Sequence, residues 1–596
     1  MVDPKKVFLP LKGLRDPAVF MAPVRVLGTI EPLIDGVETF ATMERDLAQA
    51  ERSVSLAMWS FDPRLPLVSK QQPKLPSVEA ILKDRKSDAR PQTWGELLVA
   101  LGELDVSIRV LISDFDPAYA TENHRRSWIA FFRLRQQLPA GSKAASNLEI
   151  IVPLHRAEVS PLLAKDLAAK QSLRIDAVIK QLNAVRVNKD HKAALVVLAE
   201  TPGLWEVVSL DSKGRFRRTP DTVLPIRVAS HHLKLCLIDG HTAFVGGLDP
   251  ERGRVDTPKH LSRMTSWHDV HLRVRGPHFE DFARSFEGLW AVEAPAFEAR
   301  VERLNALHDG LKLPVQRFAR RAIIEATDAG RPDEIAGRTA QVLKTMSGSM
   351  SFSGVPSIIR DDIERFYQNA IAAAEELVYL ENQYVRWPKI ADWLIARRKD
   401  RPRLQVVFVV PVAPEEVATS GATDEVTAHG LFLQSKIFSD LATTFKSDFA
   451  SVSLVRNERA SKEHATNAHG SFQIYVHSKL MIVDGGMAIV GTANANGRAF
   501  RVDTEIALGW FDPPAVLALQ RKLWGELLGS VPFSEWKTET IAANWMAAAK
   551  KNAAMPPGKR AGLVVPHPLR KGTESKSLPD EYANLYDVEA SFPAVV

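Results

Sequence analysis

The chain of 596 residues carries the same order of segments in its two halves, and this duplication constrains its fold more than any other feature. An apolar strand-like segment at 53–63 follows a helix-like stretch, and the same pair recurs with a strand at 376–385. Segments 231–247 and 476–492 each predict two strands joined by an Asp-Gly or Gly-Gly turn. Two similar halves are therefore expected.

A further pair of apolar segments, at 107–117 and 404–414, extends the correspondence. Apolar strands that alternate with helix-like stretches are typical of a sheet buried between helices. The sequence therefore predicts the α/β class, with helices on both faces of a mixed β-sheet in each half.

Differences in spacing between matched segments predict the domain boundaries. We expect an N-terminal extension at 1–30, a first lobe at 31–340 with insertions near 63–95 and 118–230, a second lobe at 341–546 and a Pro- and Lys-rich C-terminal tail at 547–596. Insertions of this kind commonly lie on the surface at the rim of a domain or control access to a binding site. Segment 345–357 is expected to be an exposed linker, and 413–430 a mobile loop over the cleft.

Composition excludes several classes of protein. Hydrophobic residues at 45% and charged residues at 25% indicate a folded globular chain rather than a disordered or fibrous one. The net charge of +6 suits an anionic partner, but so small an excess is also common without one. The single cysteine, Cys236, excludes an intramolecular disulfide and any four-thiolate metal site, and we expect it in the core.

The start of the chain has no apolar run long enough for a signal peptide, and no stretch predicts a membrane span. We expect a protein that is cytoplasmic in the producing cell or exported without a cleaved signal peptide, with peripheral contact to membranes. A partner from a secretion machine, or an immunity protein, is a hypothesis only.

Both duplicated hairpins carry the pattern His-x-Lys-x-x-x-x-Asp. The residues are His232, Lys234 and Asp239 in the first half and His477, Lys479 and Asp484 in the second. On a strand, residues two apart share a face, so each histidine is expected to point the same way as its lysine. The aspartates fall on the opposite face, and we interpret them as supports at the strand end.

This set of groups suits attack on a phosphodiester, which needs cations to offset charge, a nucleophile and an acid. The lysines supply charge without a metal, one histidine attacks phosphorus, and a protonated histidine serves the leaving alcohol. Each histidine then needs a carboxylate on its other ring nitrogen. Asp269 follows the first motif and Glu505 follows the second at comparable distances.

These residues resemble the phospholipase D superfamily, and the similarity covers roughly 30–535. Segment 246–277, which contains Trp-His-Asp at 267–269, is similar to the stretch that plant and animal phospholipases D carry after their first motif. VYLENQYV at 378–385 and GTANANGRAFRVDTEIAL at 491–508 resemble two further segments of those enzymes.

The resemblance implies two similar lobes packed pseudo-symmetrically around one active site, with no cofactor and no catalytic metal. It implies His232 as nucleophile, His477 as general acid and then base, and the two motif lysines on the phosphate. Asp269 and Glu505 become the partners of the histidines. The residues expected to bind substrate are Asn494, Asn496, Gln383 and Asp249. Asp249 stands where the second half has Asn494, which leaves its role beside an anion open.

Other histidines and aromatic residues near the motifs have simpler interpretations. The histidines are His231, His241, His260, His268 and His271; in combination they fit no zinc spacing and are expected to be structural. We interpret three aromatic residues as core residues rather than as residues of the pocket entrance: Tyr379, Tyr384 and Trp387.

The leading hypothesis is a phospholipase D that releases phosphatidate and a headgroup alcohol from glycerophospholipids at a membrane surface, with transphosphatidylation to other alcohols. The alternatives are a nuclease or another phosphodiesterase of the same superfamily, a cardiolipin synthase, and an inactive scaffold that binds anionic membranes. Glu381-Asn382-Gln383 and Trp267-His268-Asp269 disfavour the nuclease. We expect no obligatory nucleic acid partner.

Overall fold

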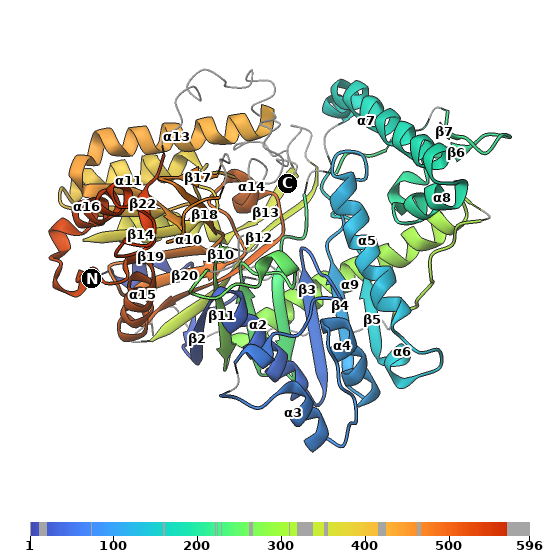
Figure 1. The fold of residues 1–596 in the computed structure, drawn as a ribbon, viewed down its shortest axis with the longest axis horizontal. Helices are drawn as coiled ribbons and strands as arrows, with labels where there is room; N and C mark the ends of the chain where they lie inside the picture. The colour runs from blue at the N-terminus through green and yellow to red at the C-terminus, as the bar shows by residue number, and fades with distance from the viewer. Residues whose placement is uncertain are drawn as a thin grey trace.

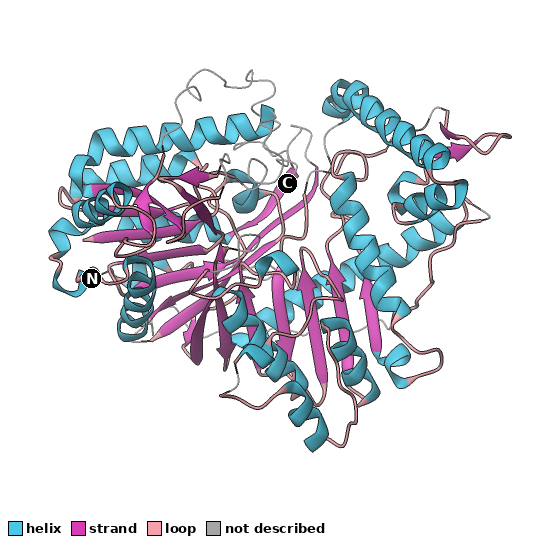
Figure 2. Cartoon of the chain, viewed as in Figure 1, coloured by secondary structure: helices cyan, strands magenta, loops and turns pink. Residues whose placement is uncertain are grey.

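The computed structural model describes residues 2–10, 21–72, 74–158, 161–220, 222, 224–227, 229–260, 266–308, 310–318, 338–350, 356–414, 425–461 and 466–568. These residues form two large mixed β-sheets with helices packed against them (Figure 1, Figure 2). The predicted α/β class is confirmed.

The first half forms a seven-stranded sheet in the order β2-β11-β9-β8-β3-β4-β5. Strands β3, β4 and β5 are parallel, and the other neighbours are antiparallel. The bounds are Thr29–Ile34 for β2, Ser53–Met58 for β3, Ser107–Ile112 for β4, Leu148–Ile151 for β5, Lys234–Ile238 for β8, Thr242–Gly246 for β9 and Val270–Arg275 for β11.

The second half repeats this arrangement. Within its thirteen-stranded sheet, the run β12-β21-β20-β19-β14-β15-β16 has the same order and the same strand directions as the first sheet. The bounds are Thr339–Met350 for β12, Leu377–Asn382 for β14, Gln405–Val409 for β15, Phe449–Val455 for β16, Lys479–Val483 for β19, Met487–Gly491 for β20 and Glu505–Phe511 for β21. The duplication in the sequence is thus a duplication of strand order.

Equivalent helices connect equivalent strands in the two halves. Before the first motif strand lie α2 (Asp35–Ala48), α4 (Trp94–Glu103) and α5 (Thr121–Gln136), which correspond to α10 (Asp362–Ala373), α11 (Pro388–Asp400) and α13 (Glu425–Phe445) in the second half. After the last strand of each repeat come α9 (His278–Asn305) and α15 (Pro513–Leu528). Their apolar stripes cover the sheets: on α2, for example, Phe40 and Leu47 are fully buried.

One short strand of the first half joins the sheet of the second half. Strand β10 (Trp267–His268) pairs in parallel with β18 (Ser471–Val476), with Trp267 opposite Tyr475 and His268 opposite Val476. A second contact between the halves is a parallel bridge from His231 of the first half to Thr504 of the second half. These two exchanges bring the segments that carry the predicted acids beside the histidines of the opposite half.

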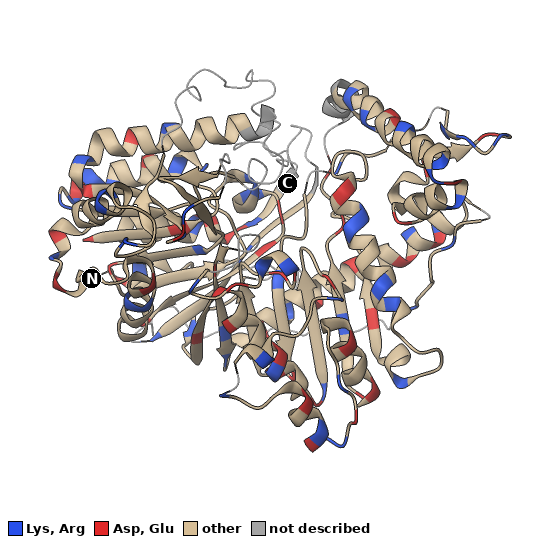
Figure 3. Ribbon diagram, viewed as in Figure 1, with Lys and Arg blue, Asp and Glu red and all other residues tan. Residues whose placement is uncertain are grey.

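The large insertion contains an arm with no counterpart in the second half. It comprises α7 (Pro161–Asn188), α8 (His191–Ala199) and a two-stranded sheet of β6 (Val208–Leu210) and β7 (Phe216–Arg218). Figure 1 shows it at the upper right, and Figure 3 shows charges of both signs along it. Tyr119 anchors α7, because its hydroxyl donates to the Leu167 carbonyl at 3.2 Å and its ring lies under the Arg174 guanidinium.

The expectation of an exposed linker at 345–357 is wrong, and two other segments are more closely packed with the second sheet than the expected boundaries indicate. Residues 345–350 of the expected linker belong to β12, where Thr345 is fully buried; 351–355 lie outside the described residues, and β13 follows at Pro356–Asp361. Part of the expected tail belongs to the second half: α16 (Ile541–Ala554) crosses the boundary at 546, and β22 (Val564–Pro566) pairs with β16. A C-terminal strand can join the sheet because β16 offers it free backbone groups.

The N-terminal segment is also no separate extension. Helix α1 (Pro4–Val7) and the residues around it pack into the core of the second half, and β1 (Arg25–Val26) pairs with β12. The expected loop at 413–430 lies mostly outside the described residues, and α13 begins at Glu425. Among the helices of the described residues, none combines the length and apolar character that crossing a membrane requires.

Candidate active site

One pocket draws its lining from both halves of the chain. Most of the predicted site residues line it: His232, Lys234, Asp249, Gln383, His477, Asn494, Asn496 and Glu505. Cations and aromatic rings that the sequence analysis did not single out complete it: Trp59, Phe115, Tyr119, Arg227, Arg254, Arg386 and Arg498. The two motif histidines therefore share a single cavity.

The histidine of the first motif is held by a carboxylate of the second half. Nδ1 of His232 lies 2.9 Å and 3.1 Å from the two carboxylate oxygens of Glu505. Glu505 is fully buried, and its second oxygen also accepts from the Thr492 hydroxyl. With Nδ1 fixed in this way, the opposite nitrogen of the ring, Nε2, is the one left for chemistry.

The histidine of the second motif is held by a carboxylate of the first half. Nδ1 of His477 lies 2.7 Å from Oδ2 of Asp269, which is fully buried between β10 and β11. The Trp267 ring packs against the imidazole with 4.8 Å between ring centroids. The two histidine–carboxylate pairs are thus crossed between the halves.

Backbone pairing explains the crossing. The His477 N–H donates to the His268 carbonyl at 2.7 Å, next to Asp269. Likewise the Thr504 N–H, next to Glu505, donates to the Ser230 carbonyl at 3.0 Å. Asp269 and Glu505 were expected as the histidines' partners, but the sequence did not indicate which acid serves which histidine. Strand exchange between halves leaves no periodic signal in the sequence.

The two motif lysines have different partners. Lys479 Nζ donates to Oε1 of Gln383 at 3.1 Å and to the His477 carbonyl at 2.6 Å. Lys234 Nζ instead lies 3.1 Å from Oδ2 of Asp249. The acid at 249 therefore neutralises the first lysine, whereas the second lysine meets only neutral acceptors in these contacts.

Burial shapes the ionisation of the site. It holds the pKa of His232 well below its ordinary range, with Lys234 and Lys479 acting in the same direction. Burial and Lys479 likewise lower the pKa of His477, while burial raises the pKa of Asp269 to about 7. Burial also lowers the pKa of Lys479 to about 7. Without substrate, both imidazoles are therefore neutral near pH 7.

The remaining predicted residues lie in two places. Asn494 and Asn496 line the pocket, where Asn496 also caps α14 (Gly497–Arg501) by accepting from the Ala499 N–H at 2.8 Å. Asp239 and Asp484 lie outside the pocket lining. Each ends its strand in a left-handed conformation, with φ of 53° and 51°.

The carboxylates of these two aspartates bind backbone N–H groups of the segment that enters the neighbouring strand. Asp239 accepts from residues 51–53 at 2.7–2.9 Å, and Asp484 accepts from residues 375–377 at 2.8–2.9 Å. They support the fold and do not touch the pocket.

The neighbouring residues that were expected in the core divide between the core and the pocket. Cys236, Tyr379 and Trp387 are fully buried. Tyr384 lines the pocket, and the Arg386 guanidinium lies 3.9 Å from its ring centroid. Arg498 lies in the segment 491–508 that resembles a family segment, whereas Arg227, Arg254 and Arg386 were not singled out from the sequence and are placed at the pocket by the fold.

The chain thus has two similar α/β halves that bring two His-x-Lys motifs to one pocket, which is the arrangement expected for the phospholipase D superfamily. The phospholipase D family model matches residues 443–538. Phospholipase D beta 2 of Arabidopsis thaliana is 25% identical over 385 residues, which cover 48% of this chain and 41% of the relative. Phospholipase D delta of the same plant is 24% identical over 415 residues, covering 50% and 48%.

Among solved structures, phosphatidylserine synthase of Haemophilus influenzae Rd KW20 matches with a TM-score of 0.44 and 11% identity, over 85% of this chain and 88% of that one. The chain spans about half the length of the curated relatives it matches. The expected resemblance to the phospholipase D superfamily is confirmed, and the relatives named here are of the plant type.

Proposed function

We propose that the protein is a phospholipase D that hydrolyses glycerophospholipids to phosphatidate and the free headgroup alcohol. The observation that carries the proposal is the pair of histidines in one pocket, each with Nδ1 bound to a buried carboxylate of the opposite half. Such pairs leave two Nε2 atoms for one reaction, as a double displacement at phosphorus requires.

In the first step, Nε2 of His232 attacks phosphorus and the bond from phosphorus to the headgroup oxygen breaks. The neutral state of His232 keeps its lone pair available. His477 protonates the leaving oxygen, which requires a proton on its Nε2. The bound phosphodiester anion supports that protonation, because a nearby negative charge raises the pKa of an imidazole.

In the second step, His477 takes a proton from water, the water oxygen attacks phosphorus, and the bond from His232 to phosphorus breaks. An alcohol in place of water would give transphosphatidylation. Lys234 and Asn494 line the pocket and would contact the phosphate oxygens, with the charge of Lys234 offset by Asp249. Lys479 does not line the pocket itself and would act on the phosphate through its charge and through Gln383, to which it donates. The direction of attack, with His232 as nucleophile, rests on the similarity to phospholipases D.

Release of choline and ethanolamine from phospholipid vesicles, assayed beside nicking of a supercoiled plasmid, tests the proposal. We expect headgroup release that is lost in the His232→Ala protein and no nicking above that of the same variant. Plasmid nicking by the wild type without headgroup release would instead identify a nuclease of the same superfamily.

A further inference from the structure

The face of α7 that points away from the core carries a row of mostly apolar residues. The row consists of five exposed residues at steps of four and three: Leu173, Ala177, Lys180, Ala184 and Val187. Steps that alternate between four and three keep side chains on one face of a helix. At about 1.5 Å per residue, the row extends over roughly 20 Å. We call it the outer face of α7.

The outer face is not needed for the packing of α7. Ile175 and Leu182, on the opposite side of the helix, are 0% and 1% exposed and belong to the hydrophobic core. Leu173 and Val187 are instead 71% and 72% exposed. A helix at the surface of a protein normally turns polar residues to the water. Large apolar residues in a row on the exposed side therefore indicate a surface that binds a partner.

Positive charge surrounds the outer face. Helices α7 and α8 together contain seven Lys and Arg and three Asp, a net charge of +4 in a chain whose total is +6, and Figure 3 shows basic residues along them. Lys189 and Lys192 are exposed where α7 is followed by α8. Of the nearby acids, Asp176 is exposed, and Asp190 caps α8 by accepting from the Ala193 N–H at 2.6 Å. The excess of positive charge complements an anionic surface.

Contacts at the start of α7 connect the helix to the wall of the pocket. Tyr119 lines the pocket, and its hydroxyl donates to the Leu167 carbonyl of α7 at 3.2 Å. The Arg174 guanidinium lies 4.9 Å from the centroid of the same ring. Gln171 of α7 is buried and donates to the Leu224 carbonyl, on the segment that leads to the first motif, at 2.9 Å. A surface that binds the outer face is therefore held beside the pocket.

We propose that the outer face of α7 docks on the surface of an anionic phospholipid bilayer and holds the pocket beside it. This proposal rests on the proposed phospholipase D function, which places the substrate in a bilayer. Leu173 and Val187 enter the boundary between headgroups and acyl chains. Lys180 extends from the middle of the row to the headgroup phosphates, as long basic side chains do at membrane interfaces.

A second copy of the chain fits the outer face less well. Two helices that pair along such a row need large apolar residues at most positions of the seam. Here alanine occupies two of the five positions and Lys180 occupies the central one. An apolar seam would bury the charge of that lysine, whereas an anionic bilayer attracts it. The composition of the row thus favours the bilayer as its partner.

Binding to vesicles tests the proposal without any assay of turnover. The full-length His232→Ala protein is used as the parent, so that hydrolysis does not change the lipids during the measurement. We expect it to cosediment with phosphatidylcholine vesicles that contain about 30% phosphatidylglycerol at least about 10-fold more tightly than with pure phosphatidylcholine. Raising the salt concentration from about 0.1 M to about 0.5 M should remove most of this preference.

Substitutions on the outer face should separate its apolar and its basic contribution. In the parent, Leu173→Gln combined with Val187→Gln should weaken binding to the anionic vesicles at least about 10-fold, because the apolar contact is lost. Lys180→Glu combined with Lys189→Glu should remove the preference for phosphatidylglycerol. Introduced into the active chain, either pair should lower headgroup release from vesicles relative to turnover of a soluble phosphodiester.

The matched control carries the same kinds of substitution far from the arm. Leu75 is 51% exposed, and Lys83 is exposed on α3 (Val78–Asp84), which lies at the bottom of Figure 1, away from α7. Leu75→Gln combined with Lys83→Glu should bind both kinds of vesicle as the parent does. Circular dichroism and Tm should show that all three variants are folded.

A dye at a single position detects the contact directly. The sole cysteine, Cys236, is fully buried, so Leu173→Cys provides one accessible thiol for a dye whose emission shifts to the blue in apolar surroundings. Anionic vesicles should shift the emission of the dye at position 173. The same dye on Leu75→Cys should show no shift.

A parent that does not bind anionic vesicles, or a dye at position 173 that does not respond to vesicles bound by the protein, would overturn the proposal. Equal binding by the Leu173→Gln, Val187→Gln variant and by the control would overturn it as well. A dimer that this variant loses, with vesicle binding unchanged, would show that the outer face binds a second copy. Vesicle binding through α7 by a wild-type protein that releases no headgroup would retain the docking face and overturn the proposed function.

Discussion

Glu505 of the second half binds Nδ1 of His232 of the first half at 2.9 Å, although the two residues lie 273 positions apart in the chain. The reciprocal pair, Asp269 with His477, has a distance of 2.7 Å and a separation of 208 positions. Neither half alone therefore contains both a motif histidine and the carboxylate that orients it. The two halves must be assembled before either histidine is oriented.

Removal of either motif histidine should abolish turnover. His232→Ala and His477→Ala should each reduce kcat by at least about 10³-fold, because nucleophilic attack and proton transfer both depend on an imidazole. Circular dichroism and Tm should stay close to those of the parent. Either variant retaining a tenth of the wild-type rate on a soluble phosphodiester would contradict a shared site.

Neutralising the crossed carboxylates should lower kcat without removing the histidines. Glu505→Gln and Asp269→Asn keep the shape of the side chain but present a donor or a weaker acceptor to Nδ1, so they favour the wrong tautomer. We expect kcat to fall by about 10²–10⁴-fold. KM should change much less, because neither carboxylate is placed on the substrate.

Asp211→Asn on the distant arm is the control, and it should leave kcat unchanged. If Glu505→Gln and Asp269→Asn both kept the wild-type kcat, the carboxylates would have no role in orienting the imidazoles.

The sequence alone predicts the α/β class, the repeated strands and the two motif histidines of the pocket, because His232 with Lys234 and His477 with Lys479 recur at fixed spacing in matching segments. It does not predict the crossed pairing, which depends on the two-residue strand β10 joining a sheet built from the other half. Similarly, the strand at Val564–Pro566 lies in a Pro- and Lys-rich stretch whose composition gives no sign of the sheet edge that recruits it.

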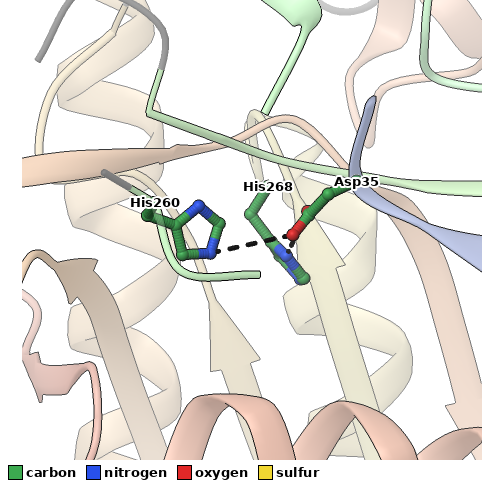
Figure 4. Close-up of side chains that lie close together, drawn as sticks. All are labelled: Asp35, His260 and His268. Atoms are coloured by element: carbon green, nitrogen blue, oxygen red, sulfur yellow. Dashed lines mark hydrogen bonds and ion pairs between the residues drawn. The ribbon is translucent and has the colours of Figure 1, made fainter. Parts of the chain in front are cut away.

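Asp35, His260 and His268 lie close together (Figure 4), and this group shows a further limit of sequence analysis. His260 and His268 match no zinc spacing, since their common neighbour Asp35 lies in another element more than 200 positions away. Only the fold brings the three together. The histidines of the catalytic motifs could be identified because the chain carries them twice, whereas nothing repeats this group.

The pH dependence of kcat/KM should reflect the buried lysine of the second motif. Burial lowers the pKa of Lys479 to about 7, so this ammonium group is charged below pH 7 and neutral above it. In the proposed mechanism this cation stabilises the bound phosphodiester, so kcat/KM should fall as pH rises through about 7. On the acid side it should fall where His232 becomes protonated, well below its ordinary range.

Lys479→Arg tests the assignment of the alkaline limb, because a guanidinium stays charged throughout this pH range. The variant should be slower, but its kcat/KM should no longer fall near pH 7. An alkaline limb that stays at the wild-type position in Lys479→Arg would show that another group titrates there.

The aspartates that end the motif strands should matter for stability and not for chemistry. Asp239→Ala leaves three backbone N–H donors at residues 51–53 without their acceptor and places alanine at a positive φ. We expect the free energy of unfolding to fall by about 3 kcal/mol. Asp239→Asn, which retains one acceptor oxygen and tolerates the left-handed conformation, should lose less. The kcat of the folded protein should be unchanged in both, and a large fall in kcat at constant Tm would place Asp239 in the reaction.

Finally, a trapped intermediate should show which histidine attacks phosphorus and which one transfers protons. With a phosphodiester whose leaving group departs without protonation, the first step no longer needs His477, whereas the second step still needs it to deprotonate water. His477→Ala should therefore accumulate a phosphorus–nitrogen adduct on His232, and His232→Ala should form none. Rapid quench at alkaline pH, followed by intact-mass and peptide analysis, locates the adduct. An adduct on His477 in the His232→Ala protein, with none on His232 in the other variant, would reverse the two roles and leave the double displacement itself unchanged.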